Sequence, residues 1–354
     1  MNALGKIIKA RIEKDGPISL HDYMQIALGH PEYGYYARQN PFGTEGDFIT
    51  APETSQMFGE LIGLWAVDVW DKLGRPKKFY LVELGPGNGT LMADAQRSAR
   101  LVPEFLTAAE IHLIENSARL RERQAYTLPD HGIHWHDELP ELSGAPVILI
   151  ANEFFDALPI HQYCHQSGVW FERMIALRDG NFVYALANTP ASVKSAASAD
   201  DGDILELCPA GNKMIEQVSK LLFREGGAAL IIDYGADEIL LGDSFQAVKR
   251  HGYTDLLVKP GEADLTTHVR FSCLKEIALS YNITVQGPTT QGRFLERLGV
   301  EARHHQLRKN ASDEQRKKLD AQLRRLISSS EMGTLFKVMA LSHNVVAATE
   351  GFGT

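Results

Sequence analysis

The sequence predicts an α/β fold built on a largely parallel sheet with helices on both of its faces. Five short apolar runs are bounded by glycine, proline or polar residues, a composition typical of strands buried on both faces. Helical stretches such as residues 90–100 and 209–225 separate these runs, and such alternation is typical of a doubly wound sheet. The expected strands are residues 79–84, 111–115, 147–155, 228–235 and 335–341.

Composition places the chain among globular proteins and argues against several functional classes. The chain has 354 residues, of which 44% are hydrophobic and 23% charged, so it can bury a large core. Its net charge of −9 argues against a nucleic-acid-binding protein, and no apolar run is long enough to span a membrane. The three cysteines are far apart, which predicts a reducing compartment and no thiolate metal site. With no signal sequence or transit peptide in view, we expect a cytoplasmic protein.

Residues 1–78 are expected to form an N-terminal helical cap with a loop that covers the binding site. Thr50 and Glu53 have the spacing of a helix capping box, with Pro52 in the first turn. Apolar residues then recur at helical spacing over residues 58–73, where two glycines would allow another element to approach closely. Residues 79–354 would form the core.

A glycine-rich turn after strand 79–84 is the first candidate binding site. Gly85, Gly87 and Gly89 would let a ligand approach the backbone and the N-terminus of the next helix. Glu83 precedes the turn, and Glu115 ends the next strand, where a carboxylate can accept both ribose hydroxyls of an adenosine. Because Glu83 would repel a pyrophosphate and attract an amine, the charges favour S-adenosylmethionine over NAD. A tight turn that binds nothing is the alternative.

Polar residues after the apolar run 147–151 form the second candidate site. Asn152, Glu153 and Asp156 follow this run, with two phenylalanines between them. Ligands of open α/β sheets bind beyond the carboxyl ends of the strands, and buried polar groups cost free energy unless they bind something. These side chains could cap the following turn or face the transferred group, and their convergence favours the second interpretation.

The later part of the chain is expected to add substrate-side elements. Residues 159–190 alternate and carry turn signals at 167–168 and 179–180, which predicts an antiparallel β insertion that would roof the active site. Residues 236–333 would add a second wall, and the charged helix at 312–328 would present a solvated face. Possible site residues in this second wall are Asp264, Thr267 and His268.

The motifs together resemble those of the MidA-like family of class I S-adenosylmethionine-dependent methyltransferases. "ELGPGNGT" is shared with many enzymes, whereas "GDFITAPETSQMFGELIGLW" (46–65), "NEFFDALPIHQY" (152–163) and "QGRFLERLG" (291–299) are more particular. The resemblance runs from about residue 19 to 341 and implies a seven-stranded Rossmann-like core with inserted substrate elements. Mitochondrial members are arginine methyltransferases that act in respiratory complex I assembly. The resemblance therefore implies a protein substrate, and the chain resembles a bacterial relative.

The resemblance also implies further site residues. The loop ahead of residue 50 would line the cofactor pocket, which makes Thr50, Pro52 and Gln56 candidates, and Trp135 or His136 would contact the adenine. His134 and His136 would share one face of a strand, as metal ligands can, but the sequence offers no third ligand beside them. We expect no metal.

Three functions stay open at this point. The first is a protein arginine methyltransferase, in which Glu153 would hold the guanidinium with Asp156 or Asp233 in support. The second is a methyltransferase that acts on a small molecule or another protein side chain. The third is an assembly factor that binds S-adenosylmethionine without catalysis. The wide insertions favour a protein substrate, and the polar strand end at 152–156 favours an enzyme.

Overall fold

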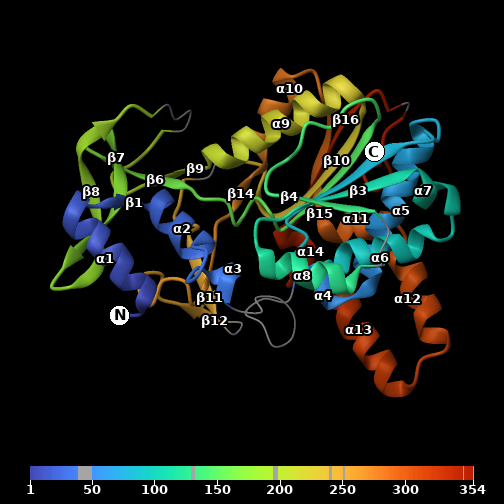
Figure 1. Ribbon diagram of the computed structural model, residues 1–354, viewed down its shortest axis with the longest axis horizontal. Helices are drawn as coiled ribbons and strands as arrows, with labels where there is room; N and C mark the ends of the chain where they lie inside the picture. Colours follow the sequence, from blue (N-terminus) through green and yellow to red (C-terminus); the bar gives the residue numbers. More distant parts are fainter. Residues whose placement is uncertain are drawn as a thin grey trace. The chain divides into compact units, whose positions relative to one another are not determined.

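The computed structural model describes residues 1–38, 50–128, 132–193, 198–238, 241–249, 252–345 and 347–353. The chain forms two compact units (Figure 1). Unit 1 comprises Met1–Phe48, Asp156–Lys213 and Glu238–Arg270, and unit 2 comprises Ile49–Phe155, Met214–Asp237 and Phe271–Thr354. Each unit is assembled from three separate stretches of the chain, and the expected division after residue 78 stays a prediction.

Unit 2 is built on the expected α/β sheet. Its described strands lie in the order β15-β16-β10-β5-β2-β3-β4. The five strands from β10 to β4 are parallel, and β16 is antiparallel to both of its neighbours, β10 and β15. Their bounds are β2 Phe79–Leu84, β3 Ala109–Ile114, β4 Ile133–His136, β5 Val147–Asn152, β10 Gly227–Ala236, β15 Thr284–Thr290 and β16 Phe336–His343. These seven strands confirm the predicted class I methyltransferase architecture for the part of the chain that the structure describes.

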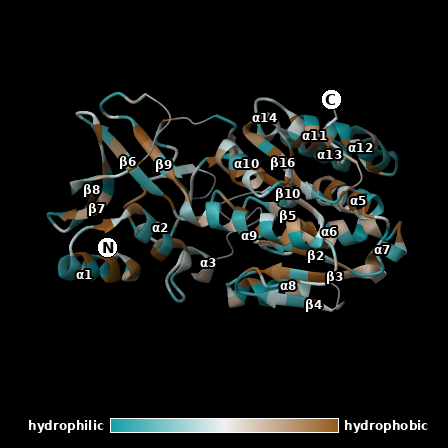
Figure 2. Ribbon diagram, turned by 90° about the horizontal axis from the view of Figure 1, so that it is seen from above, coloured by the Kyte–Doolittle hydropathy of each residue, from teal (hydrophilic) through white to brown (hydrophobic). Residues whose placement is uncertain are grey.

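The strands of this sheet are buried because helices cover them. All six residues of β2 and of β5 are buried, as their continuous apolar sequences predict. Figure 2 shows β2 in the hydrophobic colour, between helices that carry hydrophilic residues. The helices of unit 2 are α4 Ala51–Thr54, α5 Gln56–Lys72, α6 Thr90–Ala99, α7 Pro103–Ala108, α8 Ala118–Thr127, α9 Pro209–Glu225 (from Met214 on), α10 Phe271–Ser280, α11 Gln291–Arg297, α12 Val300–Lys309, α13 Asp313–Ile327 and α14 Met332–Leu335.

The order of the strands sets the position of the site. β2 pairs in parallel with β3 on one side and with β5 on the other, so the order in which the chain adds strands reverses beside β2. In open α/β sheets ligands bind at such a switch point, beyond the carboxyl ends of the strands. Leu84 of β2 lies opposite Ala151 of β5, which brings the glycine turn and the polar end of β5 to the same edge.

One prediction for the helical segment before β2 is wrong, and another is confirmed. The helix is split at Ser55 into α4 and α5, and the Thr50 side chain makes no capping hydrogen bond, so the predicted capping box is wrong. The two glycines of α5 do permit close packing, and the element that packs against them is α6. A Cβ atom on Gly59 would lie 2.6 Å from the Cβ of Asp94, and one on Gly63 would lie 2.6 Å from the Cα of Ala95.

Unit 1 contains the predicted antiparallel meander. Strands β6, β7 and β8 pair in succession, and the turns between them have positive φ angles at residues 167–168 and 179–180. These are the left-handed turns that fit the twist of a hairpin. Its role as a roof over the active site stays a prediction. The elements of unit 1 are α1 Ala3–Asp15, α2 Leu20–Gly29, α3 Tyr35–Arg38, β1 Ile18–Ser19, β6 His161–Gln166, β7 Val169–Arg178, β8 Asn181–Ala191, β9 Ile204–Leu207, β11 Gln246–Lys249, β12 Gly252–Thr254, β13 Asp264–Thr266 and β14 Val269–Arg270.

Over the residues that the structure describes, no helix is both long enough and apolar enough to cross a bilayer.

Candidate active site

The glycine turn between β2 and α6 requires its glycines. Gly85, Gly87 and Gly89 have φ angles of 62°, 54° and 79°, a left-handed conformation that residues with a Cβ rarely adopt. The turn is closed by a hydrogen bond from the Gly89 N–H to the Pro86 carbonyl oxygen (2.8 Å). It leads directly into α6, whose N-terminal N–H groups favour ligand acceptors. The turn therefore has the backbone geometry predicted for close approach of a ligand.

Glu83, two residues before the turn, is buried, and one of its carboxyl oxygens lacks a hydrogen bond from the described residues. The residue is 2% exposed, and its Oε2 has no hydrogen-bond partner among the described residues. Loss of water on burial raises the pKa of Glu83 to about 8. A cation placed beside this carboxyl would recover the interaction that burial removes, so Glu83 fits an amine better than a phosphate.

Gln124 of α8 connects three parts of the site, and it was not among the predicted residues. Its side chain donates hydrogen bonds to the Gly87 carbonyl oxygen (2.8 Å) and to Glu115 Oε2 (3.3 Å). It accepts a third from Trp135 Nε1 (2.8 Å). Gln124 is fully buried, and with Leu120 it forms the buried face of an otherwise polar helix. This i, i+4 pair is the only sequence signal that could have revealed it.

Glu115 lies where the sequence analysis expects a ribose acceptor. Its Oε1 accepts a hydrogen bond from the Ser117 N–H (2.8 Å), and its Oε2 accepts one from Gln124. Burial raises the pKa of Glu115, while these hydrogen bonds oppose that shift. The carboxylate is thus fixed beside the glycine turn, and its role toward a ribose stays a prediction.

The end of β5 places Asn152 and Glu153 beside α4. The Glu153 Oε1 accepts hydrogen bonds from the Ala51 N–H (3.1 Å) and from the Asn152 side-chain amide (3.1 Å). The first bond satisfies an N–H at the start of α4, so Glu153 also caps a helix. The strand expected to reach residue 155 ends at Asn152, because Glu153 has a left-handed φ of 50°. Asn152 Oδ1 is buried, and no described residue donates a hydrogen bond to it.

Asp156 and Asp233, the residues whose carboxylates are predicted to support Glu153, form hydrogen bonds with other parts of the chain. Asp156 falls in unit 1, where its carbonyl oxygen accepts a hydrogen bond from the Thr267 N–H (3.0 Å). Asp233 is fully buried, and its carboxylate accepts hydrogen bonds from the N–H groups of Phe155 (3.0 Å) and Tyr234 (2.9 Å). Asp233 therefore holds the backbone that follows β5 and the next residue of its own strand, β10.

The predicted site residues of the second wall also lie in unit 1. These residues are Asp264, Thr267 and His268. The His268 N–H donates a hydrogen bond to Ser244 Oγ (2.9 Å).

The segment that contains α4 is attached to the glycine turn by Glu53. The Glu53 Oε1 accepts hydrogen bonds from Asn88 Nδ2 (3.0 Å) and Thr90 Oγ1 (2.6 Å). This acidic residue therefore binds the neighbouring turn instead of capping its own helix. Thr50 and Pro52 lie at the start of this segment, where Pro52 is buried.

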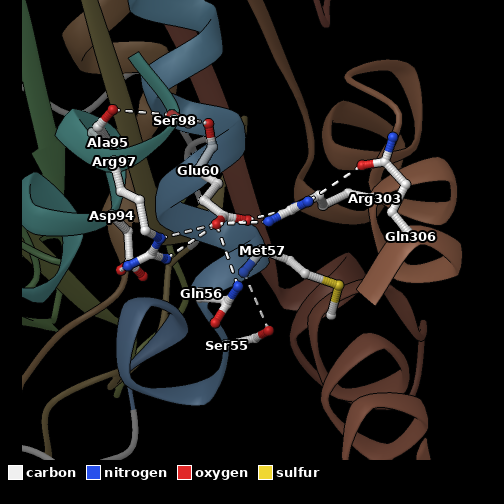
Figure 3. Close-up of polar contacts among 10 residues, drawn as sticks. All are labelled: Ser55, Gln56, Met57, Glu60, Asp94, Ala95, Arg97, Ser98, Arg303 and Gln306. Carbon is white, nitrogen blue, oxygen red and sulfur yellow. Dashed lines mark hydrogen bonds and ion pairs between the residues drawn. The ribbon is translucent and has the colours of Figure 1, made fainter. Parts of the chain in front are cut away.

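Gln56, another candidate for cofactor binding, is directed elsewhere. Its side-chain amide donates a hydrogen bond to Glu60 Oε1 (3.3 Å), and Figure 3 shows it among a cluster of charged residues. The structure thus gives Gln56 a contact within α5 and none with the glycine turn.

The two adenine candidates lie on opposite faces of β4. Trp135 belongs to the Gln124 network, whereas His136 Nε2 lies 2.9 Å from Nδ1 of His112 on β3. The His112 ring also stacks on His134 (5.0 Å between centroids), so His134 and His136 do share a face as predicted. Burial, together with both neighbouring imidazoles, lowers the pKa of His112 to about 4.

His112 is a third imidazole that the sequence analysis did not find, because only strand pairing brings it to its neighbours. The rings of His134 and His136 both stack on the ring of His112, and the three rings do not point their nitrogens at a common centre. Within the described ranges, no group of histidine, cysteine or acidic side chains is arranged to hold a metal ion.

Comparisons with known proteins agree with this geometry. The family model for S-adenosyl-L-methionine-dependent methyltransferases matches residues 61–289. The chain is 37% identical to the mitochondrial "Protein arginine methyltransferase NDUFAF7 homolog" of Drosophila melanogaster, over 98% of this chain and 86% of that protein. It is 34% identical to the NDUFAF7 protein of Homo sapiens, over 94% of this chain and 81% of that protein.

A solved structure extends the similarity to three dimensions. A Burkholderia thailandensis protein crystallised with S-adenosyl-homocysteine superposes with a TM-score of 0.87 at 29% identity, covering 99% of this chain and 94% of that one. The glycine turn, the unpaired Glu83 and the buried acceptors beside them fit a cofactor that carries an amine and a positive sulfur. The chain belongs to the MidA-like family of S-adenosyl-L-methionine-dependent methyltransferases, and S-adenosyl-L-methionine is its cofactor.

Proposed function

We propose that this enzyme methylates arginine side chains of a protein substrate. The relatives that carry the name protein arginine methyltransferase align with almost the whole chain, which supports the substrate class. The structural observation that supports it is the position of Glu153, a carboxylate held at the switch point of the sheet. A cytoplasmic location and a bacterial origin stay predictions from the sequence.

Buried acceptor atoms around the switch point suit a ligand that donates hydrogen bonds. Glu83 Oε2, Asn88 Oδ1 and Asn152 Oδ1 are all buried without a hydrogen-bond partner in the described part of the chain. They come from the end of β2, the glycine turn and the end of β5. Unmade hydrogen bonds of buried groups cost free energy, and an amine or guanidinium can supply the donors. A pyrophosphate supplies only acceptors.

The chemistry divides between cofactor and protein. When bound, S-adenosyl-L-methionine supplies a methyl group on a positively charged sulfur. The protein must hold the acceptor nitrogen in line with that methyl group and exclude water. An arginine nitrogen is a weak nucleophile while the guanidinium keeps its proton. Glu153 would bind the planar guanidinium through carboxylate oxygens and take up the proton that leaves.

The proposal is tested by transfer from isotopically labelled S-adenosylmethionine to proteins of a cell extract. Labelled proteins are hydrolysed, and the modified amino acid is identified by mass spectrometry. We expect label on methylated arginine. Label on lysine, on a carboxyl group or on a small molecule would disprove the arginine assignment and leave the methyltransferase standing. Cofactor binding without any transfer would favour the assembly-factor alternative.

The Glu153→Gln variant tests the role of the carboxylate. The amide keeps the size of the side chain and one acceptor oxygen for the Ala51 N–H, but it loses the charge. We expect cofactor affinity to stay within a few-fold of wild type while transfer to arginine falls by a hundredfold or more. Asp233→Asn is the matched comparison: its carboxylate bonds two backbone N–H groups, so the change should lower stability together with activity.

A further inference from the structure

Two neighbouring hollows on unit 2 share Arg97 of α6. The larger, of about 720 Å³, is a groove lined by side chains of α5, α6 and α12. The smaller, of about 360 Å³, lies between α6 and the end of α8. Neither hollow includes Glu83 or any residue of the glycine turn, so both are separate from the cofactor site.

The groove exposes positive charge and buries the negative charge that balances it. Glu60 receives ion pairs from Arg97 (3.1 Å) and Arg303 (2.7 Å), and Arg97 also pairs with Asp94 (2.6 Å). Figure 3 shows the two guanidinium groups meeting at Glu60 from opposite sides. The carboxylate side chains are 5% and 8% exposed, whereas the Arg97 and Arg303 side chains are 43% and 33% exposed. A partner therefore meets guanidinium groups and not the acids.

The smaller hollow contains one buried donor without an acceptor and an exposed arginine. Gln96 is only 6% exposed, and its Nε2 has no hydrogen-bond partner among the residues described. Arg100, the residue directly after α6, lines the same hollow and is exposed. A buried amide N–H without an acceptor costs free energy until a ligand supplies one. A carboxylate oxygen is an acceptor that suits both Gln96 and Arg100.

Large apolar side chains stand exposed beside these donors. Leu101 is 80% exposed, Tyr126 is 93% exposed and Leu64 is 39% exposed. Leu64 and Leu101 line the groove, and Tyr126 lines the smaller hollow. Exposed apolar groups gathered on one surface mark interaction sites, and tyrosine and arginine are enriched among the residues that dominate binding energy.

We propose that the two hollows form a docking surface for a segment of a partner protein that combines acidic side chains with aliphatic or aromatic ones. The acidic groups bind Arg100, Gln96 and the exposed edge of Arg97, and the apolar groups pack on Leu64, Leu101 and Tyr126. The net charge of −9 opposes a nucleic acid as the occupant. The surface does not take part in methyl transfer, so the proposal stands apart from the proposed reaction.

Site-specific photo-crosslinking tests the surface in the full chain. A photoreactive phenylalanine analogue replaces Leu101 or Tyr126, and the crosslinked peptides are sequenced by mass spectrometry. Leu279, 51% exposed and lining neither hollow, is the control position. We expect both test positions, and not the control, to capture the same protein through a peptide with Asp or Glu beside apolar residues.

Charge reversal at Arg100 sharpens the test. We expect Arg100→Glu to lower the crosslinking yield at both positions at least tenfold, and Arg100→Lys to keep most of it. Thermal unfolding and methyl transfer should stay at wild-type values, because Arg100 lies outside the cofactor site. The proposal is overturned by yields no higher than at position 279, by crosslinks to a second copy of this chain or to lipid, or by captured peptides without acidic residues.

Discussion

The carboxyl groups of Glu83 at the end of β2 and Glu153 at the end of β5 differ in their hydrogen bonding. Glu83 is buried with no hydrogen bond to its Oε2 from any described residue, and burial raises its pKa to about 8. Glu153, one strand away, accepts hydrogen bonds from the Ala51 N–H and the Asn152 amide and sits on a left-handed backbone. An uncompensated carboxyl favours a cationic ligand, and a bonded carboxylate is held in a fixed position. Under the proposed function, Glu83 therefore binds the cofactor and Glu153 binds the acceptor guanidinium.

The largest expected effect comes from Gly87→Val, which blocks the glycine turn between the two carboxyl groups. Gly87 has a φ of 54°, so a β-branched residue strains the turn and fills the space of the approaching ligand. We expect S-adenosylmethionine binding to become undetectable by calorimetry while the far-ultraviolet circular dichroism stays native.

Gly144→Val is the matched control for Gly87→Val. Gly144 also has a positive φ, 81°, and a Cβ there would meet nothing within 4 Å. It should therefore show a comparable loss of thermal stability with unchanged affinity. If both variants bound the cofactor like wild type, the glycine turn would not be the binding element.

Glu83→Gln is expected to weaken cofactor binding strongly. Removing the charged partner of an amine in a buried site costs roughly 3 kcal/mol, or about a hundredfold in affinity. Glu153→Gln should change affinity little, so the two variants separate the two roles. Equal effects of both variants on affinity would contradict the comparison.

Without cofactor, Glu83 should make stability depend on pH. Its folded pKa of about 8 lies above the ordinary value of 4.5, so the fold favours the protonated form. This contribution is complete below about pH 4.5 and is lost as the pH rises through 8, by roughly 4–5 kcal/mol in total. Urea unfolding should show this loss for wild type, and Glu83→Gln should remove it.

Glu115→Ala is expected to have a smaller effect on binding, of about 1.5–3 kcal/mol if the carboxylate accepts ribose hydroxyls. Calorimetry with S-adenosyl-homocysteine measures this directly, since that product retains the ribose. Gln124→Leu serves as a companion variant, because it releases Glu115 and the Gly87 carbonyl while leaving both residues in place. Wild-type affinity in the Glu115→Ala variant would refute the ribose assignment.

The imidazole stack on the opposite face of β4 should affect stability and leave binding unchanged. The pKa of His112, about 4, lies below its ordinary 6.5, so the neutral form is favoured in the fold. Its contribution is complete above pH 6.5 and is lost as the pH falls through 4, by roughly 3 kcal/mol. In urea unfolding, His112→Leu should remove this loss of unfolding free energy at acid pH. His134→Gln, at a side chain that is 51% exposed, should leave most of this pH dependence in place.

Local patterns predicted the parts of the fold that local forces determine. The strands were visible because continuous apolar runs need burial on both faces, and the turn was visible because glycine adopts its φ angles far more readily than residues with a Cβ. The hairpin turns of unit 1 follow the same logic, since Gly168 and Gly180 supply left-handed positions. The charges beside the turn favoured S-adenosylmethionine as the cofactor, and the resemblance to a family then added the activity.

The contacts that the sequence missed join distant segments. Glu53 has the spacing of a capping residue, but the fold brings Asn88 and Thr90 within its reach. Gln124 and His112 acquire their roles only when α8 packs on the turn and β3 pairs with β4. Spacing along the chain cannot decide between two possible partners of one side chain.

Calorimetric titration of S-adenosylmethionine in two buffers of different ionisation enthalpy tests the central claim most directly. If Glu83 is protonated in the free enzyme and binds the cofactor's amine, binding at pH 7 releases about one proton, because the cation lowers the raised pKa. The account predicts this release in wild type, its absence in Glu83→Gln, and no binding of NAD to either protein. Tight binding of NAD, or cofactor binding with the same enthalpy in both buffers, would contradict it.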